Sequence, residues 1–343
     1  MKQAWKRFVE QAKGYYYDLR KVVVSLGVLD CLLALSIRAG QSSYVRPIIR
    51  SEAEEIVDSS ISIKQGRHPI VETFVGSNSF VPNDTDLVGQ QRCIMLTGPN
   101  MGGKSCYMKQ VALIVLLAQI GSFVPAQSAE ISPVDRIMVR MGAQDSMEQG
   151  KSTFFLEMHE TAEILRHATA RSLVLIDELG RGTSTHDGVA IADATLRYLL
   201  DRSKCFTLFV THYHLLCQTA SQYPRESTCY HMGFFENEGE DAGLDEFAIT
   251  FLYQLTKGMA SQSFGLNVAR LARIPESVIH RAAEMSHSLA LSMHLVDTSS
   301  ANDNQNTILN TLQSHRLGQT DQVETLDALS RIWRILSPVL QKQ

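Results

Sequence analysis

Eight consecutive residues with the composition of a phosphate-binding loop are the clearest chemical feature of the chain. They are Gly98, Pro99, Asn100, Met101, Gly102, Gly103, Lys104 and Ser105, which match the pattern G-x-x-x-x-G-K-[ST]. In such a loop the glycines let backbone N–H groups surround phosphates at the start of a helix, where the helix dipole favours anions. Lys104 is then expected to reach the β- and γ-phosphates of ATP, and the Ser105 hydroxyl to ligate Mg²⁺.

The context of this loop decides between a nucleotide site and a glycine-rich turn that binds nothing. An apolar, strand-like run over 93–97 precedes the loop, and a helical pattern follows it as far as Gln119. This strand–loop–helix order is the setting in which a P-loop works. The loop residues are therefore predicted to bind ATP or ADP together with Mg²⁺.

Two acidic residues follow a second apolar run, over 173–176. Asp177 is placed to hold Mg²⁺ through water, and Glu178 to polarise an attacking water, which indicates a hydrolase and not a kinase. An apolar run that ends in Asp-Glu is a weak signal alone, since many strands run into polar turns. The P-loop about seventy residues upstream makes it a strong one.

A histidine stands after the next apolar run, 207–210. His212 is placed to contact the γ-phosphate or the attacking water. The alternative is an ordinary hydrogen-bonded residue at the end of a strand. Its position in a series of polar strand ends favours the catalytic interpretation.

The elements that must position these residues alternate along the chain. Strands are predicted over 60–63, 70–74, 93–97, 173–176 and 207–210, and helices over 1–39 (one or two), 104–119, 154–168 and 189–200. The near-continuous apolar strands are typical of parallel strands covered on both faces. The alternation predicts an α/β fold with a mostly parallel central sheet flanked by helices.

Composition excludes some functional classes. The chain has 343 residues, a formal net charge of −4 and six cysteines without a C-x-x-C pair. The net charge therefore argues against a protein that binds nucleic acid through bulk positive charge alone, and the cysteine spacing indicates no zinc or redox motif. The apolar segment 22–37 resembles a membrane anchor. However, Val22, Leu26, Leu29 and Leu33 share one helical face, which favours a buried helix of a soluble protein and no membrane association.

The C-terminal third carries three further features. The stretch 236–246 is acidic and is expected to be a solvated loop. Residues 262–290 predict two short helices around Ile274-Pro275. From 291 to 343 the chain turns polar and is expected to be partly disordered, with a terminal helix over 326–340.

Taken together, the motifs resemble the ATPase domain of the MutS mismatch-repair family. The resemblance rests on Thr97–Ser105, Asp177–Gly188, Thr211–Tyr213 and Gly66–Ile70, and runs from about 56 to 289. It implies a P-loop ATPase of the ABC type that works as a dimer. Tyr230–Phe234 and Ser263–Ala269 most resemble the third eukaryotic branch of the family. That branch pairs with a second MutS homologue and recognises insertion/deletion loops.

The resemblance also implies a division of the chain and a role for the paired helices. Residues 1–55 resemble the end of the family's helical lever region, and 56–261 the ATPase domain. Residues 262–290 resemble its helix-turn-helix dimerisation element, and 291–343 form a tail. Without the resemblance the paired helices suggest DNA binding. Their weak positive charge and apolar face favour dimerisation.

Five side chains receive roles from the resemblance alone. Ser152 resembles the residue offered in trans to the γ-phosphate of the partner subunit, although it also suits a helix N-cap. Asn100 is implied to position the γ-phosphate or the water, Phe80 to stack on adenine, and His231 to lie near the base. Asp187 resembles a residue of the loop that faces the partner.

Cys106 departs from the family pattern, which has Ser or Thr at this position. A thiol is a weaker hydrogen-bond donor than a hydroxyl, so one contact to the α-phosphate is expected to weaken, with lower nucleotide affinity but intact chemistry.

Two functional hypotheses remain open. The first is an ATPase module that couples nucleotide state to recognition of mismatched or looped DNA, through regions that family members carry ahead of the ATPase. It implies a second MutS homologue subunit, MutL-type repair proteins and the nucleus. The second is a truncated, non-catalytic dimerisation fragment, because the chain resembles only the C-terminal third of a family member. A transporter nucleotide-binding domain is disfavoured, since no Leu-Ser-Gly-Gly-Gln run occurs.

Overall fold

The structure, a computed structural model, describes residues 2–41, 43–50, 59–76, 79–142, 153–236, 249–259, 265–286 and 288. The chain divides into two compact units, 1–265 and 266–343. Ser152, the acidic stretch 237–246 and the tail 291–343 lie outside the described residues. The predictions made for them therefore stay predictions.

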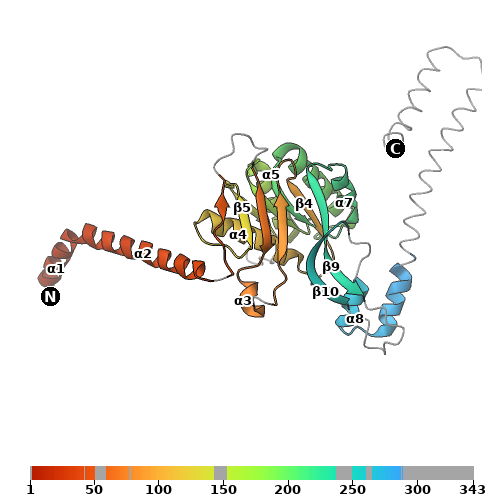
Figure 1. Cartoon of the computed structure of the whole chain (residues 1–343), viewed down its shortest axis with the longest axis horizontal. Helices are drawn as coiled ribbons and strands as arrows, with labels where there is room; N and C mark the ends of the chain where they lie inside the picture. Colours follow the sequence, from red (N-terminus) through yellow and green to blue (C-terminus); the bar gives the residue numbers. More distant parts are fainter. Residues whose placement is uncertain are drawn as a thin grey trace, which may run out of the picture. The chain divides into compact units, whose positions relative to one another are not determined.

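A six-stranded sheet forms the centre of the first unit (Figure 1). Its strands, in spatial order, are β10 (Ile249–Lys257), β9 (Ser227–Glu236), β4 (Cys93–Thr97), β8 (Phe206–Val210), β7 (Leu173–Asp177) and β6 (Ile137–Arg140). All neighbours pair in parallel except β10, which is antiparallel to β9. Every residue of β4 and β8 is buried, which explains their continuous apolar sequences. The predicted α/β class is confirmed.

A second sheet packs on one face of the first through a shared helix. Its strands are β1 (Ile48–Ile49), β5 (Ser128–Ile131), β2 (Ile61–Gly66) and β3 (Asn83–Leu87), in that order. The helix α4 (Lys104–Gln119) contributes Met108 and Val111 to a core cluster that also holds Ile63 of β2 and Leu96 of β4. The helix that begins at the P-loop is thus fixed from both sides.

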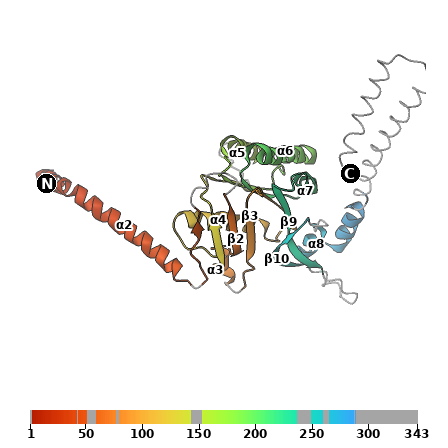
Figure 2. The ribbon, with the colours of Figure 1, turned by 45° about the horizontal axis from the view of Figure 1, so that its top comes forward.

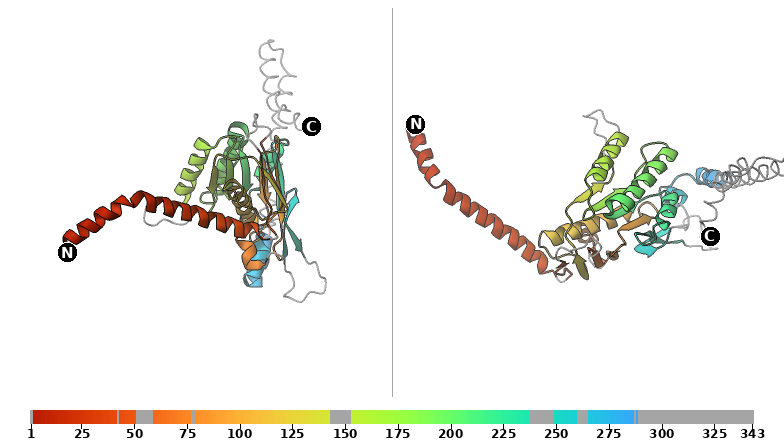
Figure 3. Two further views of the ribbon diagram at one scale, coloured as in Figure 1. Left: turned by 60° about the vertical axis from the view of Figure 1, so that its left-hand side comes forward. Right: turned by 90° about the horizontal axis from the view of Figure 1, so that it is seen from above.

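The opposite face of the central sheet is covered by three helices (Figures 2 and 3). These are α5 (Thr153–His167), α6 (Thr185–Tyr198) and α7 (His214–Ser221), and α6 continues into a π-helical turn, η3 (Leu199–Ser203). Because strand side chains alternate, Met95 and Phe209 pack in the cluster of these helices, whereas Leu96 and Val210 belong to the cluster of α4.

One predicted strand is wrong. Residues 70–74 were expected to be extended because of their β-branched and aromatic side chains, but Val71–Val75 form a short helix, α3. Nδ1 of His68 lies 3.2 Å from the backbone nitrogens of both Ile70 and Val71, so it accepts hydrogen bonds from N–H groups of the first turn. This local cap outweighs strand propensity.

The N-terminal region is two helices, α1 (Lys2–Gly14) and α2 (Tyr16–Ala39). The predicted burial of one face of α2 is wrong for this chain, because Val22, Leu26, Leu29 and Leu33 are between 54% and 62% exposed. By length and composition alone α2 could cross a membrane, and none of its residues is buried in the structure. Its apolar surface has no cover within the described residues of the chain.

The second unit contains the predicted pair of short helices. The helix α8 (Gly265–Leu271) is followed by a turn at Arg273 and a helix over 276–286. Arg273 is left-handed at φ 59°, and Nε of Arg270 lies 3.2 Å from Oε1 of Glu276 across the turn. Two short helices around Ile274-Pro275 are therefore confirmed.

Candidate active site

The sheet topology brings the polar strand ends together. β8 lies between β4 and β7, and all three run in parallel, so their carboxyl ends meet at one edge. The P-loop follows β4, Asp177 ends β7 with Glu178 directly after it, and Thr211-His212 follows β8. Such an edge of an open α/β sheet is where ligands bind.

The P-loop has the backbone conformation of a tight phosphate-binding turn. Gly98 and Gly103 have φ of 126° and 95°, and Met101 is left-handed at φ 66°. A Cβ atom at Gly98 would lie 3.1 Å from the backbone nitrogen of Met232, so a side chain would crowd β9. Gly98 is therefore required by its backbone conformation and by this close approach.

Lys104 is folded into its own loop. Its ammonium donates hydrogen bonds of 2.9 Å to the carbonyl oxygens of Gly98 and Pro99, and the residue is 4% exposed. Burial lowers the pKa of Lys104, while Glu178 and Asp177 act in the opposite direction. The charge is thus held at the centre of the loop.

Ser105 and Asp177 form a paired oxygen site. The Ser105 hydroxyl donates a 2.6 Å hydrogen bond to Oδ2 of Asp177. Oδ1 of Asp177 is buried and has no hydrogen-bond partner among the described residues. Burial raises the pKa of the Asp177 carboxyl group. An unpaired carboxylate oxygen beside a hydroxyl is a donor set suited to a hard cation, so these two residues fit Mg²⁺.

Glu178 is held in an unfavourable backbone conformation. Its φ is 56°, and its N–H donates to the carbonyl of Val210 at 2.9 Å. The carboxylate contacts the guanidinium of Arg181 and lies 2.8 Å from Nε2 of His212. The hydrogen bond from His212 lowers the pKa of Glu178, with burial opposing and Arg181 assisting. The carboxylate is therefore ionised at neutral pH.

His212 connects this carboxylate to the P-loop. Its Nε2 lies 2.8 Å from Oε1 of Glu178 and 2.9 Å from Oδ1 of Asn100. Both neighbours are acceptors, so the proton is assigned to Nε2. His212 is thus a shared donor that fixes Glu178 and Asn100 relative to each other.

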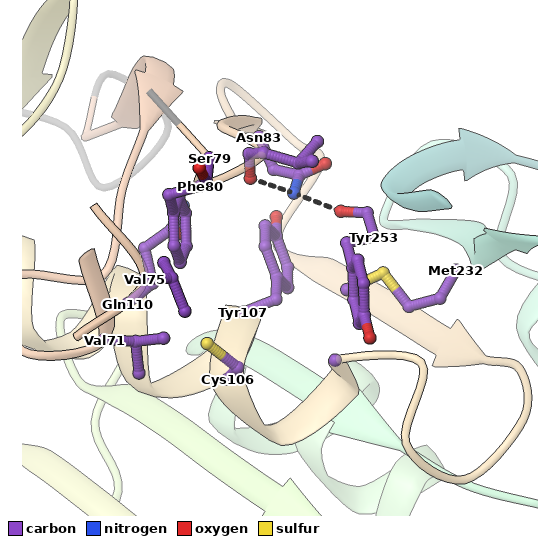
Figure 4. A pocket seen from close by; sticks show the side chains of 12 residues that line it. Val71, Val75, Ser79, Phe80, Asn83, Cys106, Tyr107, Gln110, Met232 and Tyr253 are labelled. Carbon is purple, nitrogen blue, oxygen red and sulfur yellow. Dashed lines mark hydrogen bonds between the residues drawn. The ribbon is translucent and has the colours of Figure 1, made fainter. Parts of the chain in front are cut away.

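A cavity of about 390 Å³ opens beside Gly103 (Figure 4). Phe80 and Tyr253 stand on opposite sides of it, Tyr107 lies between them, and the Cys106 sulfur points towards Val71. The lining is mostly apolar, as expected for a flat, weakly polar group. Phe80 thus lines this cavity, and its expected stacking on adenine stays a prediction. His231 is not among the described lining residues; its Nδ1 lies 3.2 Å from the carbonyl oxygen of Gly258.

Tyr253 is a residue that the sequence analysis missed. It sits in an irregular part of β10 between Phe251 and Leu255, with φ of 54°. The amide of Asn83 holds this segment: its nitrogen donates to the Tyr253 carbonyl at 2.8 Å, and its oxygen accepts from the Leu255 N–H at 2.6 Å. Because this clamp joins residues 170 positions apart, no local pattern could have revealed it.

Comparison with known proteins identifies the family. The family model of MutS domain V matches residues 94–290, more than half of the chain. The chain belongs to the MutS family. Its residues 94–290 are the MutS ATPase region, and MutS proteins are ATPases of DNA mismatch repair.

Within the MutS family the chain is similar to the Msh3 branch. It is 48% identical to "DNA mismatch repair protein Msh3" of Mus musculus over 292 residues, which covers 83% of this chain and 26% of the relative. The corresponding values are 48% over 293 residues, 83% and 25% for the protein of Homo sapiens, and 46% over 287 residues, 83% and 26% for that of Arabidopsis thaliana. The chain thus spans about a quarter of the length of these MutS relatives.

The remaining predicted residue of this MutS site that is described is Asp187. It lies exposed in the first turn of α6, where its N–H donates to Ser184 Oγ at 3.3 Å and its carboxylate accepts from the Ser184 hydroxyl at 2.8 Å. Ser184 is thus the N-cap of α6, and the Asp187 side chain stays at the surface.

Proposed function

We propose that this MutS ATPase region binds Mg²⁺-ATP and hydrolyses it as one half of a composite site. The observation that carries the proposal is the convergence of three strand ends on one point. The hydroxyl–carboxylate pair of Ser105 and Asp177 lies beside the hydrogen-bonded set of Glu178, His212 and Asn100.

The nucleotide is expected to lie across the start of α4. Its base enters the apolar cavity between Phe80 and Tyr253, where aromatic side chains favour a flat heterocycle. Its phosphates lie in the P-loop, with Lys104 turning its ammonium from the loop carbonyls to the β- and γ-phosphates. His231 stays a proposed neighbour of the base.

Hydrolysis needs an oriented water and a neutralised phosphate. Mg²⁺ held by Ser105 and Asp177 supplies electrostatic stabilisation of the phosphoryl oxygens when bound. Glu178 is ionised because His212 donates to it, so it can orient the water and accept its proton. Asn100 is held by the same histidine and is proposed to position the γ-phosphate or the water.

The second half of the site is proposed to come from a second MutS homologue subunit. Ser152 is proposed to act in trans at the partner's nucleotide, and the exposed Asp187 to face the partner. The helices at 265–271 and 276–286 are proposed as the dimerisation element, within a division of 1–55, 56–261, 262–290 and 291–343. We further propose that the nucleotide state reports recognition of mismatched or looped DNA to MutL-type proteins in the nucleus, without membrane association.

ATP turnover with and without the partner subunit tests this proposal against a non-catalytic dimerisation fragment. The proposal predicts Mg²⁺-dependent turnover that rises on adding the partner and is lost in Glu178→Ala. Turnover no higher than that of Glu178→Ala, with the two subunits still pairing, would favour the fragment.

A further inference from the structure

A buried carboxylate that no role above uses lies under the loop that carries Glu178. Glu157, on the first turns of α5, is only 5% exposed in its side chain. Its Oε1 accepts a 2.7 Å hydrogen bond from the backbone N–H of Gly180, two residues beyond the proposed base. A buried acid of this kind is costly unless it is paired and hydrogen-bonded, so its contacts indicate a specific task.

The second oxygen of Glu157 is paired with a buried arginine. Oε2 lies 3.2 Å from Nη2 of Arg140, whose side chain is 4% exposed. Arg140 is the last residue of β6 and lies in register with Ile176, next to Asp177 on β7. The ion pair thus ties α5 to the sheet beside the site and leaves one carboxylate oxygen for Gly180.

Gly180 itself is held from three sides. Its N–H donates to Glu157, and its carbonyl accepts from the Tyr213 hydroxyl at 3.1 Å. It is left-handed at φ 94°, and a Cβ atom there would lie 2.5 Å from the carbonyl oxygen of Gly188. These contacts together fix the backbone conformation at Gly180.

The fixed position of Gly180 matters because the backbone conformation at Glu178, two residues earlier, is unfavourable. Glu178 has φ of 56°, a conformation that a residue with a side chain keeps only when its surroundings impose it. One end of the turn is fixed by the bond from the Glu178 N–H to Val210, and the other by the contacts of Gly180. Between them the Glu178 carboxylate reaches His212 at 2.8 Å.

We propose that Glu157 is a positioning residue for Glu178: its carboxylate fixes the turn that aims the base at the attacking water, without touching the nucleotide. This inference rests on the proposed ATP hydrolysis. It predicts that loss of the Glu157 carboxylate lowers kcat and leaves nucleotide binding intact. Glu157 does not line the cavity between Phe80 and Tyr253, and within the described residues its carboxylate bonds to Gly180 and Arg140 and not to the P-loop.

The experiment compares Glu157→Ala and Glu157→Gln in the 343-residue chain with its MutS-family partner. Glu157→Ala is expected to lower kcat by about 10- to 100-fold, with KM and the Kd for ATP within about two-fold of wild type. Glu157→Gln keeps an oxygen for the Gly180 N–H and is expected to restore kcat to within about five-fold of wild type. Glu163→Ala, on the same helix with a side chain 43% exposed, is the matched control and should leave kcat unchanged.

A purely structural role for Glu157 predicts a different pattern. In that case kcat per bound nucleotide, measured well below Tm, stays within about two-fold of the control. That result, or a change confined to KM, would overturn the inference. If Glu157→Ala does not fold, Glu157→Asp takes its place, because its carboxylate keeps the charge beside Arg140 but is one methylene short of Gly180.

Failure of ATP hydrolysis is separated from failure of this inference. The ATPase activity of wild type is first compared with that of Glu178→Ala. If wild type is more active than this variant, ATP hydrolysis is established, and the Glu157 variants then test positioning alone. If wild type shows no such activity, the NMR signals of the His212 imidazole supply the test. They should shift in Glu157→Ala and not in Glu163→Ala, and unchanged signals in both would contradict the inference.

Discussion

The hydroxyl of Ser105 lies 2.6 Å from Oδ2 of Asp177, although 72 residues separate them in the sequence. Ser105 lies in the first turn of α4, the helix after β4, and Asp177 ends β7, two strands away in the sheet. The other Asp177 oxygen is buried without a partner among the described residues, so the pair has acceptor capacity that the protein itself does not use. A cation bound there would give the buried Asp177 oxygen a partner.

Asp177→Asn is expected to stabilise the chain in the absence of nucleotide while abolishing Mg²⁺-dependent hydrolysis. Burial raises the pKa of Asp177, so the ionised form opposes folding: stability is lost as pH rises from the unfolded pKa through the raised folded one. The amide removes this cost, with Tm at pH 7 rising by about 2 °C. Thermal melts at pH 7, with the exposed Asp18→Asn as control, check it; a lower Tm than the control would contradict this account of Asp177.

His212→Ala is expected to change the pH dependence of turnover as well as its rate. The bond from His212 lowers the pKa of Glu178, so its loss moves the acidic limb of the kcat profile to higher pH. We also expect kcat to fall by roughly 100-fold, because Glu178 and Asn100 lose their common donor. The pH–rate profile of ATP hydrolysis measures both effects. An acidic limb at the wild-type pH would show that His212 does not set the ionisation of Glu178. His167→Ala, an exposed histidine at the end of α5, is the control.

Phe80→Ala and Tyr253→Ala are each expected to weaken ATP and ADP binding by about five- to ten-fold, because each removes one aromatic side of the cavity. Tyr253→Phe keeps the ring and is expected to bind within about two-fold of wild type. Titration with a fluorescent adenine nucleotide measures the Kd. Phe74→Ala, on α3 but 83% exposed, is the matched control. If Phe74→Ala and the two cavity variants bind nucleotide with equal affinity, the base does not bind in this cavity.

Cys106→Ser is expected to raise ATP affinity by about two- to five-fold, since a hydroxyl is a better donor to phosphate than a thiol. The thiol points to Val71 in the cavity wall, and burial raises its pKa, so it stays a protonated, weak donor. Isothermal titration of ATP, with the exposed Cys31→Ser as control, gives the comparison. An unchanged Kd would mean that the residue contributes no phosphate contact.

The grouping of the catalytic side chains at one edge could be predicted because it depends on strand order alone. Lys104, Asp177 and His212 follow apolar runs, and parallel strands bring such ends to one edge. The helix α3 was missed because the His68 side chain caps it, a contact that strand propensity does not include. Tyr253 was missed because its place depends on the amide of Asn83, far away in the chain. The exposure of α2 could not be foreseen, since a helical apolar pattern does not say what covers it.

Single-turnover hydrolysis by Glu178→Gln, in the presence of the partner subunit, tests the central claim most directly. If Glu178 activates the water, ATP and Mg²⁺ bind to the variant with wild-type affinity, because Lys104, Ser105 and Asp177 are intact, while bound ATP is cleaved at least about 100-fold more slowly. Cleavage of bound ATP by Glu178→Gln at the wild-type rate would contradict the assignment of Glu178 as the residue that activates water.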